Sequence, residues 1–168
     1  MQKLIFLDID GVLATPKFTK DGMWWINPEQ VKLLKYIIDQ TSAKIVLSSS
    51  WRNINVEETK IYMKEHDFSL FEEIIGVTIR AYQYIDRSKK IHLSIPRGVE
   101  IKQWLDTHIH SDNGVNWNRL ELYKDYNYVI IDDDTDMLLE QKDNFVQCNS
   151  EVGLTQELVN KAIQILNN

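Results

Sequence analysis

Two acidic residues, Asp8 and Asp10, follow an apolar run at residues 4–7 and are separated by one residue. Side chains two positions apart on an extended chain point to the same side, so one carboxylate can attack an electrophile while the other gives or takes a proton. Serines follow a second apolar run at residues 48–50, and three more acids follow a third at residues 132–134. Acids and hydroxyls placed in this way are expected to hold a metal ion and to carry out chemistry beside it.

The elements that must position these residues are indicated by short apolar runs that alternate with helical patterns. Helices are expected over residues 27–40, 56–66, 99–108 and 154–166, with Asn27 and Thr155 as N-caps. Strands are expected over residues 3–9, 44–50, 126–133 and 144–148. This alternation is typical of parallel strands joined by crossover helices, and the most apolar runs belong in the middle of the sheet.

The polar clusters follow the carboxyl ends of the three runs that belong in the middle of the sheet. In an open parallel sheet these ends share one edge, where ligands bind, so the clusters are expected to form one pocket. Four or five carboxylates in one pocket repel one another unless a cation lies among them. Hard oxygen ligands of this kind favour Mg²⁺ over zinc, and the sequence therefore predicts a Mg²⁺ site.

The segments DIDGV, LSSSWR and VIIDDD, with a cation before the last of them, resemble the four motifs of the haloacid dehalogenase (HAD) superfamily of phosphotransferases. The strand that ends in serines followed by WR is similar to small, capless HAD domains associated with nucleic-acid repair. The resemblance extends from Leu4 to the final helix, although residues 53–95 match nothing specific. It implies an α/β, HAD-like Rossmannoid fold with a central, mostly parallel sheet and helices on both faces.

The resemblance also implies a role for each acid. Asp8 is the expected nucleophile, which forms an aspartyl-phosphate, and Asp10 the general acid and then base, whose backbone carbonyl binds Mg²⁺. Asp133 is the expected metal carboxylate, and Asp132 its neighbour that orients water or the cation. The expected metal site thus comprises Asp8, Asp10, Asp132 and Asp133. Two further acids, Asp134 and Asp136, are expected to stabilise the N-terminus of the following helix through its dipole.

Phosphate binding is predicted for three positions. Gly11 lets the chain turn so that backbone amides can approach a phosphoryl oxygen. Ser49 is preferred over Ser48 as the hydroxyl that donates to phosphate. Arg97 opens a helix just ahead of the last acidic strand and is the preferred cation. The alternative cations are Lys90 and Lys102.

Three residues in or beside the motifs have less specific predicted roles. Trp51 is expected to be a packing anchor rather than a substrate contact. Arg52 is either a second phosphate ligand or the partner in a surface ion pair. Val12 stands where many family members carry threonine, which leaves the tuning of Asp10 open.

The spacer between the first two motifs is short and mostly one helix, so no large cap domain is expected and bulky substrates could enter.

Composition limits the class of protein. The 168 residues, 43% of them hydrophobic, suit one domain spanning residues 1–168. A net charge of −6 argues against a protein that coats nucleic acid by bulk electrostatics. The N-terminus has no signal pattern, and no apolar stretch approaches the ~20 residues of a membrane span, so a cytoplasmic protein without a membrane partner is expected. The single cysteine, Cys148, is expected in the core.

One stretch, residues 80–102, reverses the overall charge, with six cations against two acids. Its interleaved rings and cations suit a nucleotide or single-stranded nucleic acid, although a solvated basic loop has the same composition. The residues concerned are Arg80, Tyr82, Tyr84, Arg87, Lys89, Lys90, His92, Arg97 and Lys102.

The sequence therefore predicts a Mg²⁺-dependent phosphomonoester hydrolase that acts through an aspartyl-phosphate on a nucleotide or a polynucleotide end. A small-metabolite phosphatase is the first alternative. A receiver-like phosphoaspartate domain is the second, but it would carry its acid pair and its acceptor aspartate on different strands. A noncatalytic binding module is the third, and it would lack a motif, whereas none is missing here.

Overall fold

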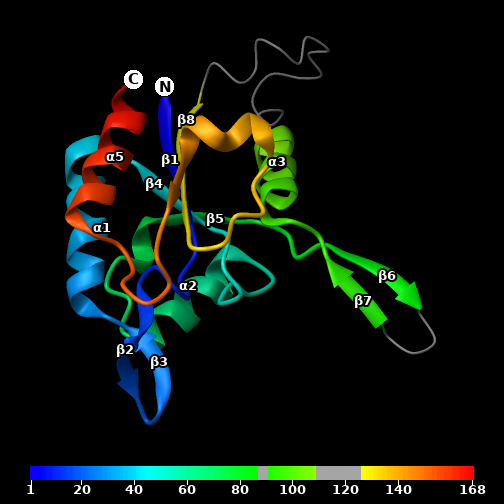
Figure 1. Cartoon of the computed structure of the whole chain (residues 1–168), viewed down its shortest axis with the longest axis horizontal. Coiled ribbons are helices and arrows are strands. Elements are labelled where there is room, and N and C mark those ends of the chain that lie inside the picture. Colours follow the sequence, from blue (N-terminus) through cyan, green and yellow to red (C-terminus); the bar gives the residue numbers. More distant parts are fainter. Residues whose placement is uncertain (87–90, 109–125) are drawn as a thin grey trace.

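The computed structural model describes residues 1–86, 91–108 and 126–168, and for residues 82–86 and 91–93 it describes the backbone alone. A five-stranded parallel sheet lies at the centre of this part of the chain (Figure 1). Its order is β5 (Ile74–Val77), β4 (Lys44–Leu47), β1 (Gln2–Leu7), β8 (Tyr126–Asp132) and β9 (Phe145–Gln147). The three strands predicted to lie in the middle, β4, β1 and β8, do so.

Helices form where the sequence predicts them. They are α1 (Pro28–Thr41), α2 (Val56–Glu65), α3 (Arg97–His108) and α5 (Gln156–Asn167), together with the 3₁₀ turns η1 (Phe71–Glu73) and η3 (Leu139–Asn144). Both predicted N-caps are confirmed: the Asn27 side chain accepts the Glu29 N–H at 2.9 Å, and the Thr155 side chain accepts the Leu158 N–H. Each cap satisfies a backbone donor that the first turn of a helix leaves free.

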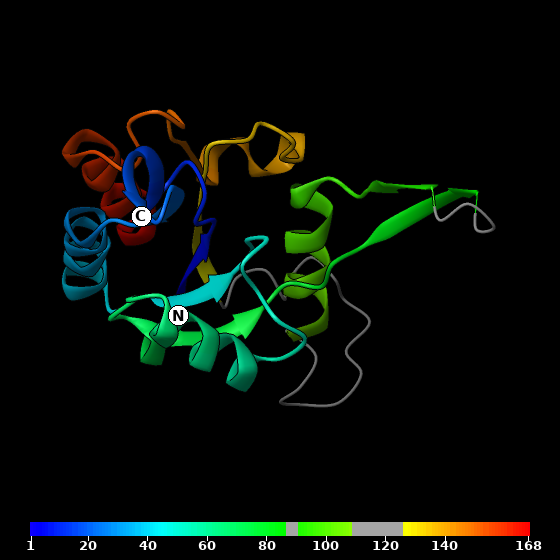
Figure 2. The ribbon, with the colours of Figure 1, turned by 90° about the horizontal axis from the view of Figure 1, so that it is seen from below.

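The helices cover both faces of the sheet, as predicted (Figure 2). Side chains alternate along β1, so Leu4 and Phe6 pack on one face and Ile5 and Leu7 on the other, and all four are fully buried. The first pair meets α3, where the Phe6 ring stands edge-on to that of Trp104 with centroids 5.5 Å apart. The second pair belongs to the larger core formed with α1, α2 and α5.

Two antiparallel hairpins were not predicted. The first, β2 (Ala14–Lys20) with β3 (Met23–Ile26), lies between β1 and α1, so the spacer holds more than the one helix expected. The second, β6 (Tyr82–Asp86) with β7 (Ile91–Ser94), projects away from the sheet (Figures 1 and 2). Between β1 and β4 the chain forms only the first hairpin and α1, which agrees with a capless domain. The predicted cations Arg87, Lys89 and Lys90 lie outside the described residues.

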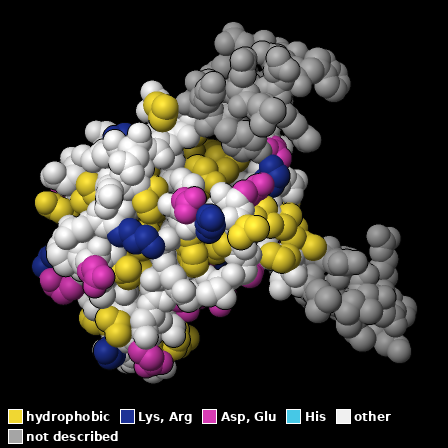
Figure 3. Space-filling model, turned by 45° about the horizontal axis from the view of Figure 1, so that its top comes forward, with side chains coloured by type: hydrophobic (Ala, Val, Ile, Leu, Met, Phe, Trp, Pro, Cys, Tyr) yellow, Lys and Arg dark blue, Asp and Glu magenta, His cyan; other side chains and the backbone are white. Residues whose placement is uncertain are grey.

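The surface carries charges of both signs. On the face in Figure 3, Lys and Arg side chains of the described residues lie interspersed with Asp and Glu rather than in a patch of one sign. No helix in residues 1–86, 91–108 or 126–168 has both the length and the apolar character needed to cross a membrane.

Candidate active site

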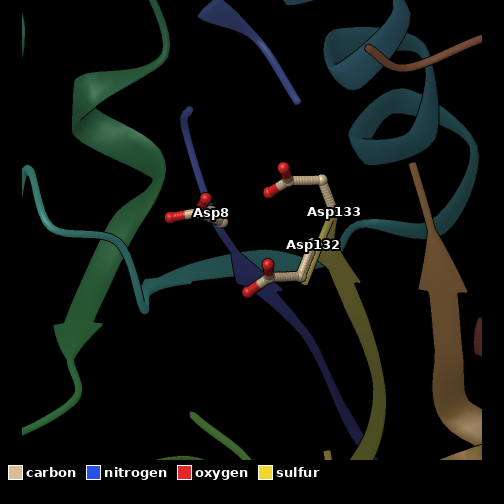
Figure 4. Close-up of side chains that lie close together, drawn as sticks. All are labelled: Asp8, Asp132 and Asp133. Carbon is tan, nitrogen blue, oxygen red and sulfur yellow. The ribbon is translucent and has the colours of Figure 1, made fainter. Parts of the chain in front are cut away.

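Three carboxylates meet at the carboxyl edge of the sheet, from Asp8 just beyond β1 and from Asp132 and Asp133 at the end of β8 (Figure 4). The parallel register pairs Leu7 with Ile131, and the Asp8 N–H donates to the Ile131 carbonyl at 3.0 Å. One oxygen from each of the three carboxylates lies within 4.8 Å of the others. The structure thus brings together acids that are more than 120 residues apart in the sequence.

Burial of this cluster opposes its ionisation. Burial raises the pKa of Asp8 to about 6, even though the Arg97 guanidinium and a hydrogen bond from the Ser49 side chain lower it. Burial, followed by the charge of Asp8, raises the pKa of Asp132 to about 8, and burial also raises the pKa of Asp133. A cation bound among the carboxylates would stabilise their charged forms and so offset the cost of burying them.

The donor set fits a hard divalent cation. Its three side chains offer carboxylate oxygens, the ligands that Mg²⁺ prefers. Asp132 Oδ2 is buried and has no hydrogen-bond partner among the residues that the structure describes. A buried carboxylate oxygen without a donor is costly unless something else compensates its charge. Asp8, Asp132 and Asp133 are therefore suitable metal ligands, and the predicted use of the Asp10 backbone carbonyl stays a prediction.

Arg97 brings a positive charge to the same pocket. Its Nη2 lies 3.9 Å from Asp8 Oδ1 and its Nε 3.9 Å from Asp132 Oδ2. Its Nη1 is buried and, in the described part of the chain, has no hydrogen-bond partner. A guanidinium beside a nucleophilic carboxylate, with a donor to spare, is suited to bind a phosphoryl oxygen. The alternative Lys102 pairs instead with Asp106 and Glu140, and Lys90 lies outside the described residues.

The start of α3 is fixed by a distant acid. The Arg97 N–H donates to Asp136 Oδ2 at 2.8 Å, so Asp136 satisfies an N-terminal donor of α3. The prediction that Asp136 serves the helix that follows it is wrong: the next element is the 3₁₀ turn η3, and the helix whose N–H it accepts lies earlier in the chain. Gly98 permits this contact, because a Cβ there would lie 2.5 Å from the Leu138 nitrogen.

Asp10 lies beside the cluster and is held by two donors. The indole Nε1 of Trp51 lies 3.0 Å from both carboxylate oxygens, and Ser50 Oγ lies 3.2 Å from Oδ2. Trp51 also packs against the main core, so its prediction as a packing anchor is correct but incomplete. Both donors fix the orientation of the carboxylate that would move a proton.

The two serines considered for phosphate binding occupy different surroundings, although both are fully buried. The Ser49 side chain lies close enough to Asp8 to lower the pKa of its carboxyl, whereas the Ser48 hydroxyl has no hydrogen-bond partner among the described residues. Ser49 Oγ also accepts the Trp51 N–H at 3.3 Å. Of the two hydroxyls, that of Ser49 therefore lies against the proposed nucleophile.

The geometry agrees with a comparison of the chain with known protein families. Residues 4–159 match the family described as the HAD domain in Swiss Army Knife RNA repair proteins. The chain belongs to this family. Membership confirms the resemblance to small HAD domains of nucleic-acid repair and indicates a HAD-type phosphatase related to RNA repair. No significant match was found among the curated proteins or among the solved structures.

Gly11 of this HAD domain serves the turn after β1. Its φ of 70° is left-handed, and a Cβ at this position would lie 2.3 Å from Asp133 Cγ. Its N–H donates to the Ala14 carbonyl at 2.7 Å, so this amide is engaged within the turn and does not face an open site. A glycine is required here by backbone conformation and by the closeness of Asp133. Any backbone amide that binds phosphate in this turn must therefore belong to a residue other than Gly11.

Arg52 forms an ion pair, but in the interior rather than on the surface as predicted, and its alternative role as a phosphate ligand stays a prediction. Its Nη2 lies 2.6 Å from Glu100 Oε2, and both side chains are buried, so the ion pair is internal rather than on the surface. Its other N–H groups donate to the carbonyls of Ser49 and Thr78. Arg52 thus ties the serine loop of the HAD domain to β5 and α3. Within α3, Val99 is exposed, whereas its neighbour Glu100 is buried.

Sequence reasoning missed an aromatic group behind Asp10. The His66 ring lies 5.4 Å from that of Trp51 and 4.0 Å from that of Tyr62, and Trp25 of β3 adds a further contact at 4.9 Å. Trp25 Nε1 also donates to Asp67 at 2.9 Å, which ties the first hairpin to the end of α2. Tyr62 and His66 thus pack on Trp51, and Trp25 packs on His66.

Cys148 lies in the core, as predicted, close to the acids of the HAD domain. Its N–H donates to the Asp132 carbonyl at 2.8 Å. Burial and, secondly, the charge of Asp132 raise the pKa of the thiol to about 12. Its surroundings therefore favour the neutral thiol over the reactive thiolate.

Proposed function

We propose that this HAD domain is a Mg²⁺-dependent phosphomonoester hydrolase that acts through an aspartyl-phosphate on a nucleotide or a polynucleotide end. One observation carries the proposal: the Asp8, Asp132 and Asp133 carboxylates lie within 4.8 Å of one another, with the Arg97 guanidinium 3.9 Å from Asp8. The proposed nucleophile, the candidate metal ligands and the proposed phosphate-binding cation therefore lie close together. Phosphoryl transfer requires this combination.

The first half of the reaction forms the covalent intermediate. A carboxylate oxygen of Asp8 attacks phosphorus, and the bond from phosphorus to the ester oxygen breaks. Asp10, protonated at this stage, gives its proton to the departing oxygen, so the alcohol leaves neutral. Arg97 and Ser49 bind the non-bridging phosphoryl oxygens as charge redistributes over them.

The second half of the reaction returns the enzyme to its starting state. Asp10, now a carboxylate, takes a proton from a water molecule, whose oxygen attacks phosphorus. The bond between Asp8 and phosphorus breaks, and inorganic phosphate leaves. Asp8, Asp132, Asp133 and the Asp10 carbonyl would hold Mg²⁺, which when bound supplies neutralising charge to the carboxylates and the phosphoryl group.

Two features support a nucleic-acid end as the substrate. The family that the chain belongs to is described by its place in RNA repair proteins. Between the first two motifs the chain forms only a hairpin and one helix, so no cap domain inserted there encloses the pocket and excludes large substrates. A polynucleotide end is a bulky substrate that an open site of this kind can accept.

The direct experiment measures phosphate release by the purified protein with Mg²⁺ from four substrate classes. These are 3′-phosphorylated oligoribonucleotides, 5′-phosphorylated oligoribonucleotides, mononucleotides and phosphorylated metabolites. We expect the highest kcat/KM for a nucleotide or oligonucleotide, and no turnover by Asp8→Asn, which keeps the shape of the side chain. Faster hydrolysis of a metabolite than of every nucleotide would favour the small-metabolite phosphatase instead.

A further inference from the structure

Two hollows lie next to the proposed site and share Arg80 and Arg52 in their walls. The first has a volume of about 220 Å³ and includes Arg97, the cation proposed to bind the reacting phosphate. The second has a volume of about 400 Å³ and lies beyond Arg80. Each is large enough for part of a nucleotide, and Arg80 stands between the two.

Arg80 is held in place by the loop that carries the serine motif. Its Nη2 donates to the backbone carbonyls of Ser50 and Arg52, the latter at 2.9 Å. The residue is exposed, and its Nε and Nη1 donate to no residue in the described part of the chain. A guanidinium that is held through one of its nitrogens can still donate hydrogen bonds to a ligand from the other two.

The charges in these walls differ in their availability. Arg52 is buried and compensated by Glu100 at 2.6 Å, so it offers little to an anion in either hollow. No carboxylate of the described residues forms an ion pair with Arg80. Asp134 and Asp136 also line the first hollow, and Asp136 Oδ2 accepts the Arg97 N–H. No described carboxylate lines the second hollow, so Arg80 is the cation available to an anion where the two hollows meet.

The second hollow has the character of a site for a flat, partly apolar group. Ile54 and Ile79 line it with large apolar side chains that are 92% and 46% exposed. Asn53 adds an amide to the same wall, and the buried Thr78 hydroxyl has no hydrogen-bond partner among the described residues. Apolar surface beside polar groups suits a nucleobase, which packs through its face and hydrogen-bonds through its edge.

We propose that Arg80 binds the phosphodiester that joins the terminal nucleotide to the next one. The terminal phosphate then lies at Asp8 and Arg97, its nucleoside occupies the first hollow, and the following base enters the second. This inference rests on the proposed phosphatase function and narrows its substrate to a polynucleotide end of two or more nucleotides. Arginine is suited to this role because its fork matches two phosphate oxygens.

The test compares kcat/KM for a terminally phosphorylated dinucleotide with that for the mononucleotide of its reacting end. The wild-type protein should prefer the dinucleotide. Arg80→Gln should lower the ratio of the two values about tenfold, mainly through KM, because a hydrogen bond to a charged group is lost. Lys32→Gln removes the same charge from α1, outside the site, and should leave the ratio unchanged. Melting temperatures of both variants check that the fold is kept.

Two results would overturn the inference. An Arg80→Gln variant that loses the same factor on both substrates would assign Arg80 to holding the Ser50 and Arg52 carbonyls only. A wild-type protein without preference for the dinucleotide would show that no phosphodiester is bound. If the proposed phosphatase function itself is wrong, the wild-type protein will release phosphate from neither the dinucleotide nor the mononucleotide, which distinguishes the two failures.

Discussion

The indole N–H of Trp51 lies 3.0 Å from both carboxylate oxygens of Asp10. A tryptophan that packs against the core therefore also holds the side chain that the proposed reaction uses to move a proton. The rings of Tyr62 and His66 pack on Trp51, so the orientation of Asp10 depends on α2, which carries none of the family motifs.

Trp51→Phe should keep an aromatic ring in this position but remove the N–H. We expect about a tenfold loss of kcat on an alkyl phosphate or oligonucleotide, whose leaving oxygen needs a proton, because the hydrogen bond that orients the Asp10 side chain is lost. p-Nitrophenyl phosphate needs no proton and should be affected less. Asp10→Asn should show the same contrast more strongly. Equal losses on both substrates would contradict a role for Trp51 in positioning the acid.

Removal of divalent cations should abolish activity, because Asp8, Asp132 and Asp133 share one buried cluster. EDTA should stop phosphate release and added Mg²⁺ should restore it. Asp133→Ala should weaken Mg²⁺ binding in calorimetry by at least about tenfold. Asp134→Ala removes the same charge one residue later, outside the three-carboxylate cluster, and should weaken it less. Full activity in chelator would contradict the metal site.

The stability of the metal-free protein should fall as pH rises. Burial raises the pKa of Asp8 to about 6 and that of Asp132 to about 8, from an ordinary value of 3.8. The folded state then binds more protons than the unfolded state across this window, so the free energy of unfolding decreases with pH. With EDTA present, the melting temperature should drop between about pH 5 and about pH 8.5, and Mg²⁺ should raise it more at the higher pH. A melting temperature that rises over this range would contradict the assignment.

The buried ion pair between Arg52 and Glu100 should contribute to stability, not to chemistry. Glu100→Gln leaves the Arg52 charge buried without its partner and should lower the free energy of unfolding by about 3 kcal/mol in urea titrations. Glu29→Gln makes the same change in the exposed Lys32–Glu29 pair and should cost less than about 1 kcal/mol. A similar decrease in the free energy of unfolding in both variants would show that burying the Arg52 charge without its partner is no more costly than exposing it.

The central sheet and the convergence of the acids could be predicted from the sequence because both follow from local patterns. Continuous apolar runs mark β1, β4 and β8, and acids or serines follow each of them directly. Helix caps such as Asn27 depend on residues two or three positions away, so they too are visible in the sequence. The first hairpin also had a local signal that was overlooked. Asp21-Gly22 forms its turn with two positive φ angles, the usual preference of a two-residue hairpin loop.

The contacts that surround the acids could not be predicted, because they join side chains that are distant in the sequence. Trp51 reaches Asp10 across the edge of the sheet, and Asp136 caps a helix that begins 39 residues earlier, at Arg97. From the sequence, Arg52 could be a phosphate ligand or the partner in a surface ion pair, and only the packing of α3 shows that Glu100 is buried against it. Local patterns define where strands end, whereas tertiary packing decides what each polar side chain meets there.

The most direct test of the central claim is to trap the covalent intermediate. Wild-type protein is mixed with a terminally phosphorylated oligoribonucleotide and Mg²⁺, quenched in acid within the first turnover and digested for mass spectrometry. The account predicts a phosphoryl group on Asp8, and neither the label nor phosphate release in Asp8→Asn. Rapid phosphate release without a labelled Asp8, together with more than about 1% of wild-type activity in Asp8→Asn after contamination is excluded, would contradict it.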